Sequence, residues 1–62
     1  MYQVQIYHLG ELVNRFEFGT LRKALNCFVE HADSKQLNIA EDGKYAYDNE
    51  RFPEVEVKLI EL

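Results

Sequence analysis

Few side chains in this sequence could take part in catalysis. Cys27 and His31 are four residues apart, so on one helix they would share a face, close enough for an imidazole to activate a thiol. No third residue is placed to orient that histidine, and 62 residues leave little room for a substrate cleft. Glycine-rich phosphate loops and nucleophile motifs are absent. The sequence therefore predicts a protein that is not an enzyme, with no catalytic residue and with Cys27 beside a buried helical stripe.

The same residue types do not make a metal site. Cys27, His8 and His31 are too few for the usual tetrahedral zinc set, and their spacing is not that of a zinc motif. The segment "EDGK" lacks the ligand spacing of a calcium loop. We therefore predict neither a metal nor a cofactor. Because Cys27 is the only cysteine, no disulfide can form within the chain, and a lone thiol suits a reducing compartment.

Charge is distributed unevenly along the chain. Residues 1–36 carry equal numbers of acidic and basic side chains, so the formal net charge of −4 lies in residues 37–62. Nucleic-acid binding draws most of its affinity from neutralised phosphates, and an acidic domain is poorly suited to it. The acidic half is instead a candidate surface for a basic partner, or it only maintains solubility and discourages strand aggregation. The carboxylates of this half that could form such a surface are Glu41, Asp42, Asp48, Glu50, Glu54 and Glu56.

Three basic side chains form an alternative site. Arg22 and Lys23 lie in the first turn of a predicted helix and have no acidic residue four positions later, and Arg15 precedes them. Together they would bind an anion or a nucleic acid. The competing interpretation is that they are solvated charges or members of surface ion pairs, which contribute little.

The first 18 residues alternate apolar and polar side chains around Gly10-Glu11, which predicts a β-hairpin with strands at residues 2–9 and 12–18. The apolar positions are even-numbered in both strands, so a two-residue turn at Gly10-Glu11 would put them on opposite faces of the sheet. We therefore expect a loop of odd length or a bulge at Gly10. The expected cross-strand pairs are Ile6 with Phe16 and Val4 with Phe18.

Residues 20–33 predict a helix. Thr20 follows Gly19 and is a good N-cap. The apolar positions that follow have the spacing of one helical face, which should cover the apolar face of the hairpin. These positions are Leu21, Ala24, Leu25, Phe28, Val29 and Ala32.

The remaining residues predict a second hairpin and a final strand. Asp42-Gly43 is a strong turn signal between residues 37 and 47, and residues 54–62 alternate like a strand. The predicted fold is a single compact α+β domain over residues 1–62, an antiparallel sheet of four to five strands with one amphipathic helix on one face. A domain of this size buries only about 60 % of its unfolded surface, so association with a second copy would add needed stability.

The sheet face without the helix is the predicted contact surface. Tyr45 and Tyr47 are two residues apart and share a face, and tyrosine is enriched at protein interfaces. The alternative is that these rings are ordinary half-buried tyrosines of an edge strand. If the C-terminal strand lies at an edge, its apolar end would meet a second copy or another protein, or it would fray. The candidate partner-binding residues are Tyr7, Tyr45, Tyr47, Glu54, Glu56 and Ile60.

The segment "VQIYHLGELVNRFEFGTLRKALNCF" resembles a pattern of short bacterial and phage proteins, in which a hairpin ending in F-x-F-x-T leads into a helix with an Ala-Leu stripe. It covers less than half of the chain and carries no functional residue across. The resemblance implies a small accessory protein, a class that includes phage-encoded inhibitors of host machinery.

These observations predict a small acidic, non-enzymatic protein-interaction module that binds and occludes a basic surface of a partner protein, alone or as a homodimer. The alternatives are anion or nucleic-acid binding through Arg15, Arg22 and Lys23, or a structural subunit of a homo-oligomer. The sequence has neither a secretory signal pattern nor an apolar run of the ~20 residues that span a bilayer. We therefore predict a cytoplasmic protein without membrane contact.

Overall fold

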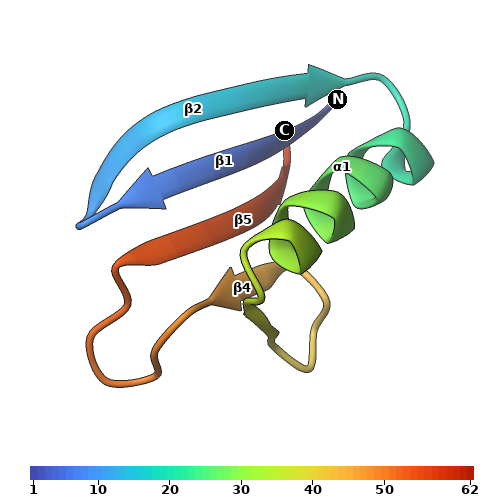
Figure 1. Cartoon of the computed structure of the whole chain (residues 1–62). Coiled ribbons are helices and arrows are strands. Elements are labelled where there is room, and N and C mark those ends of the chain that lie inside the picture. The colour runs from blue at the N-terminus through green and yellow to red at the C-terminus, as the bar shows by residue number, and fades with distance from the viewer.

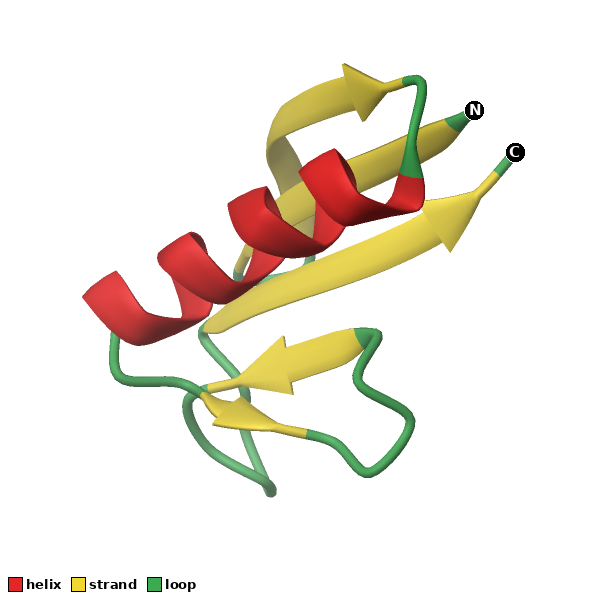
Figure 2. Cartoon of the chain, turned by 90° about the vertical axis from the view of Figure 1, so that its right-hand side faces the viewer, coloured by secondary structure: helices red, strands yellow, loops and turns green.

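The computed structural model describes all 62 residues as one five-stranded antiparallel sheet with one helix across one face (Figures 1 and 2). This arrangement confirms the predicted α+β fold. The strand order is β2-β1-β5-β4-β3, so the two ends of the chain lie on neighbouring central strands. The elements are β1 (Tyr2–His8), β2 (Glu11–Phe18), α1 (Leu21–Ser34), β3 (Asn38–Ile39), β4 (Tyr45–Tyr47) and β5 (Val55–Glu61).

The first hairpin has a two-residue turn at Leu9-Gly10, one residue earlier than the Gly10-Glu11 centre suggested by the sequence, and not the loop of odd length that we considered. Leu9 and Gly10 have φ angles of 51° and 83°, the two left-handed residues of a type I′ turn. His8 therefore pairs with Glu11. A two-residue turn of this kind matches the right-handed twist of the strands, even though leucine rarely adopts a positive φ.

A bulge in β2 brings the apolar residues of the hairpin to one face, as predicted, but it lies at Val13 and not at Gly10. Tyr7 pairs with Leu12 whereas Ile6 pairs with Asn14, which leaves Val13 without a partner on β1. The predicted pairs were consequently wrong, because each phenylalanine pairs with a β1 residue two positions before the predicted one. Phe16 pairs with Val4, and Phe18 pairs with Tyr2.

Helix α1 begins where the sequence predicts, because the Thr20 side chain accepts a hydrogen bond of 3.3 Å from the Lys23 backbone N–H. Its buried stripe is narrower than predicted and consists of Ala24, Phe28 and Ala32. The other three predicted positions stay exposed by 36–43 %, because α1 lies over β1 and β5 and leaves β3 and β4 largely uncovered (Figure 2). They are Leu21, Leu25 and Val29. This helix is neither long nor apolar enough to cross a membrane.

Strand β5 occupies the middle of the sheet, so the condition under which its apolar end would meet a partner as an edge strand is not met. It pairs with β1 on one side and with β4 on the other. Its register places Leu59 beside Val4 and Val57 beside Ile6, which joins the apolar faces of β1 and β5 under α1. The core so formed consists of Val4, Ile6, Ala24, Phe28, Ala32, Ala46, Val57 and Leu59.

The second hairpin turns around Asp42-Gly43, as predicted. Asp42 Oδ1 accepts a bond of 3.0 Å from the Lys44 N–H, and Gly43 has a φ of 70°. The Gly43 N–H donates to the Ala40 carbonyl at 3.0 Å. The turn places Ala46 in the core, and Tyr45 and Tyr47 therefore point away from the helix.

Candidate protein-interaction surface

One side of the sheet carries no helix, and we call it the open face. Side chains alternate along a strand, so the neighbours of the core residues lie on this side. The register agrees, because Tyr47 pairs with Glu56, and Glu56 with Tyr7. From β2 to β4, the open face consists of Arg15, Glu17, Gln3, Gln5, Tyr7, Glu56, Lys58, Ile60, Tyr45 and Tyr47.

A row of hydrogen bonds runs along β1 on the open face. The Tyr7 hydroxyl donates to Gln5 Oε1 at 2.8 Å, and Gln5 Nε2 donates to Gln3 Oε1 at 2.9 Å. Gln3 Nε2 then donates to Glu17 Oε1 on β2 at 3.1 Å. Lys58 adds a cation–π contact, its Nζ lying 4.6 Å from the centre of the Tyr7 ring. This row explains how Gln3 can be only 6 % exposed, since its amide has partners within the protein.

The β4–β5 side of the open face is built around two tyrosines. The rings of Tyr45 and Tyr47 stack with centroids 5.4 Å apart. The Tyr45 hydroxyl donates to Glu56 Oε2 at 2.6 Å. That bond to Glu56, followed by burial and by the nearby negative charge, raises the pKa of Tyr45 from 10.0 to about 12. Both rings are half-buried, and the stacking together with the Tyr45–Glu56 bond restricts their rotation, which lowers the side-chain entropy that would be lost on binding.

The segment between β4 and β5, residues 48–54, borders these tyrosines. Asn49 Oδ1 accepts from the Arg51 N–H at 3.0 Å, and Asp48 Oδ1 accepts from the Glu54 N–H at 2.9 Å. These bonds hold an irregular loop whose Phe52 is 80 % exposed, the most exposed of the large apolar side chains. Sequence reasoning missed Phe52. The signal was an aromatic residue in the otherwise polar stretch "DNERFP", outside any alternating pattern.

A shallow hollow joins the 48–54 loop to the open face. It has a volume of about 210 Å³ and is lined by Tyr45, Tyr47, Asn49 and Glu50. On its other side, the 48–54 loop is tied to the tip of the first hairpin, because the Leu9 N–H donates to the Glu54 carbonyl at 2.7 Å. Two tyrosine rings and the Glu50 side chain therefore surround one hollow, and the loop that borders it also carries the exposed Phe52.

The structure brings five of the six predicted partner-binding residues onto the open face: Tyr7, Tyr45, Tyr47, Glu56 and Ile60. Glu54 is exposed and lies in the adjoining loop, one residue before β5. The basic residues are not brought together. Arg15 pairs with Gln5 on the open face, whereas Arg22 and Lys23 lie on α1, which covers the opposite face.

Cys27 and His31 show no catalytic arrangement. Burial, and then the carboxylate of Glu30, raises the pKa of the Cys27 thiol, which keeps it protonated and poorly nucleophilic. The His31 ring stacks on Phe16 with centroids 5.3 Å apart, and His8 lies exposed at the end of β1. No three residues among His, Cys, Asp and Glu are grouped so that they could hold a metal ion.

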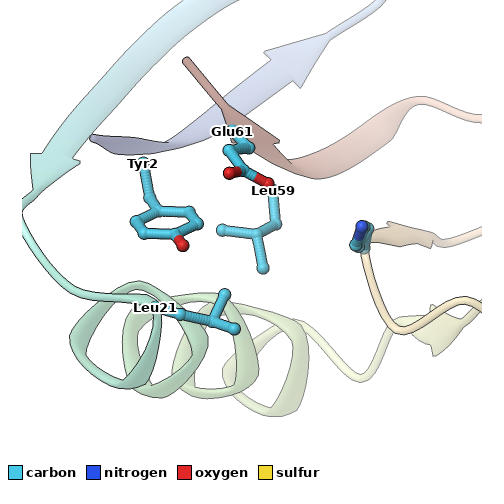
Figure 3. Close-up of a pocket in the computed structure, with 5 residues that line it drawn as sticks. Tyr2, Leu21, Leu59 and Glu61 are labelled. Carbon is cyan, nitrogen blue, oxygen red and sulfur yellow. The ribbon is translucent and has the colours of Figure 1, made fainter.

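A second hollow lies on the helix side of the sheet, between the start of α1 and the end of β5 (Figure 3). Its volume is about 70 Å³, and Tyr2, Leu21, Leu59, Glu61 and Lys44 line it. Both hollows are smaller than the ~300 Å³ at which small-molecule pockets begin. The broad open face, rather than either hollow, is therefore the candidate binding surface.

Comparisons with known proteins give no guide to what this surface binds. No protein-family model matches the chain, and neither does any curated protein or solved structure. The function proposed below is therefore inferred from the physical properties of the open face and of the 48–54 loop.

Proposed function

We propose that this protein is a non-enzymatic interaction module of the cytoplasm that binds, and thereby occludes, a basic surface of a partner protein. The contact region would be the β4–β5 side of the open face together with the 48–54 loop. One observation carries this proposal: a stacked pair of tyrosines is bordered by a segment, residues 48–56, with four acidic side chains and one basic side chain.

The composition of the region suits a protein partner. Tyrosine and other aromatic side chains supply most of the binding energy at many interfaces, because they combine a large apolar area with a polar tip. Carboxylates around such a centre accelerate encounter with a basic surface and select against acidic ones. The same carboxylates would repel nucleic-acid phosphates.

The size of the region is also suitable. A standard interface buries about 800 Å² on each partner. That area is roughly a fifth of the 4486 Å² surface of this protein. The proposed contact region does not include α1, so exposed positions on the helix can serve as controls.

The test is an affinity capture from host lysate, with nuclease, that compares three forms of the tagged protein. The site variant is Glu50→Lys with Glu54→Lys, which reverses charge beside the tyrosines without touching the Tyr45–Glu56 bond. The matched control is Glu30→Lys with Asp33→Lys, which makes the same charge change on exposed positions of α1. We expect a basic protein that the wild type and the control retain and the site variant loses.

Two outcomes would overturn the proposal. One is a partner retained equally by all three forms, which would show that the acidic region takes no part in binding. The other is capture that disappears with nuclease, which would indicate nucleic-acid binding instead. A Tyr47→Ala variant separates the aromatic contribution from the charge, and we expect it to weaken the same interaction.

A further inference from the structure

We propose that two copies of this protein pair through the free edge of β2, antiparallel and about a two-fold axis at Phe16, to form a continuous ten-stranded sheet. Strand β2 has eight residues and only one neighbour, β1, whereas the opposite edge is the two-residue strand β3 (Figure 1). A long open edge presents unpaired backbone donors and acceptors to another strand. This inference does not depend on the proposed function, because it uses a different part of the molecule.

The backbone of β2 directs its free groups outward at Arg15 and Glu17. Backbone groups of the odd-numbered residues in and beside β1 point toward β5. At one end the Leu9 N–H donates to the Glu54 carbonyl, and at the other the Met1 carbonyl accepts from the Leu62 N–H. The backbone N–H and C=O groups of the even-numbered β1 residues therefore point toward β2, where Val4 pairs with Phe16. Arg15 and Glu17 flank Phe16, so their N–H and C=O groups point away from β1.

The hydrogen bonding of Arg15 agrees with this direction. Its N–H donates to the side chain of its own neighbour, Asn14 Oδ1, at 2.9 Å and not to a carbonyl of β1. The Asn14 side chain is exposed, so it can turn away when another strand approaches. Around Phe16, Arg15 of each copy would then exchange backbone hydrogen bonds with Glu17 of the second copy.

The side chains select the same register. With Phe16 on the axis, Arg15 lies opposite Glu17 of the second copy, and Glu17 opposite Arg15 of the second copy. Opposite charges across a strand pair are stabilising and like charges are destabilising. Moving the axis to Arg15 would oppose the two arginines, and moving it to Glu17 would oppose the two glutamates. The two Phe16 rings meet on the helix side, where aromatic cross-strand pairs add to the attraction.

A second copy is thus the occupant that the edge fits best. The charge pattern is self-complementary, because a second Arg-Phe-Glu strand read in the opposite direction places an opposite charge across from each charged residue. The bulge at Val13 twists the other end of β2 and confines regular pairing to residues 14–18. The contact is therefore short, and we expect a reversible dimer rather than extended aggregation.

The test is sedimentation equilibrium of the whole chain and of three charge variants, each checked for folding by circular dichroism. Arg15→Glu and Glu17→Arg each place like charges opposite one another at both contacts, and we expect each to weaken dimerisation by about tenfold or more. The control is Arg22→Glu, which makes the same charge change on α1 as Arg15→Glu and should leave the dimer unchanged.

Mixing the two weakened variants gives the sharpest result. Arg15→Glu in one chain and Glu17→Arg in the other restore opposite charges at both contacts, so the mixture should form a heterodimer that neither variant matches alone. A wild type that stays monomeric up to roughly 1 mM would overturn the proposal. A dimer that Arg15→Glu leaves intact, or variants that do not rescue each other, would overturn it equally.

Discussion

The hydrogen bond between Tyr45 and Glu56 makes a direct prediction about titration at the candidate surface. The pKa of Tyr45 is raised to about 12, first because the neutral hydroxyl donates to the Glu56 carboxylate. In Glu56→Gln, the neutral amide can turn and donate to the phenolate, so the hydrogen bond no longer favours the protonated hydroxyl, and the negative charge that repels the phenolate is also gone. We expect the pKa of Tyr45 to fall by about one unit or more, toward the ordinary value near 10.

The sign of the stability effect follows from the raised pKa. The folded state holds the Tyr45 proton more tightly than the unfolded state, so the stabilisation is complete below pH 10 and is lost as the pH rises from 10 to about 12. A shift of two units corresponds to about 3 kcal/mol in full. Because Tyr45 is only half-buried and solvent screens the pair, we expect about 1 kcal/mol.

The assay is the ultraviolet absorbance of phenolate against pH, with Tyr45→Phe used to assign the step among the four tyrosines. The control is Glu54→Gln, which makes the same substitution at a carboxylate that forms no bond to Tyr45. The reasoning is refuted if Tyr45 of the wild type titrates at its ordinary pKa, or if Glu56→Gln and Glu54→Gln shift it equally.

Three further predictions concern the framework that holds this surface. Phe28→Ala should remove about 3–5 kcal/mol, which is comparable with the roughly 3–9 kcal/mol expected for the whole domain, so thermal melts should show a largely unfolded protein. Leu9→Asn should raise the free energy of unfolding by about 1 kcal/mol, and the urea midpoint with it, since asparagine tolerates the φ of 51° better than leucine does; a lower midpoint would contradict the turn assignment. Cys27 should react with a thiol reagent more slowly than a free thiol at neutral pH, and Glu30→Gln should speed the reaction by lowering the pKa of Cys27; equal rates would contradict this.

The sequence predicts which residues share a face better than it predicts which residues pair. Alternation alone places Tyr45, Tyr47 and Glu56 together, because side-chain direction in a strand has a period of two. The register of the first hairpin depends on a leucine with positive φ and on a bulge at Val13. The sequence does not reveal the position of either feature, since one extra residue at any point of the hairpin would bring the same apolar residues to one face.

The central position of β5 is a second feature that local patterns could not determine. Its apolar residues on both faces fit an interior strand as well as an edge strand that meets a partner. Only the pairing of β5 with both β1 and β4 decides between these, and that pairing depends on contacts between residues far apart in the chain. Phe52 was missed for a related reason, because exposure in an irregular loop is set by hydrogen bonds that involve Asp48 and Asn49.

The two sides of the open face are suited to different tasks. A helix of 14 residues is about 21 Å long and can cover only one face of the sheet. On the β1–β2 side, the glutamine side chains find their hydrogen-bond partners within the protein, because the amide groups of Gln3 and Gln5 bond to one another and to Tyr7 and Glu17. Because the glutamine amides on that side already have partners within the protein, we assign the proposed partner contact to the β4–β5 side.

The proposed dimer keeps these partner contacts accessible. Pairing at β2 puts the two β4 strands near opposite ends of the ten-stranded sheet, seven strand spacings apart. At about 4.8 Å for each spacing, the two tyrosine pairs would be roughly 34 Å apart on the same face. The dimer would then bind two partner molecules, or two basic sites on one partner. A monomeric Arg15→Glu variant should accordingly keep its affinity for a single site and lose the gain in binding that a two-site partner provides.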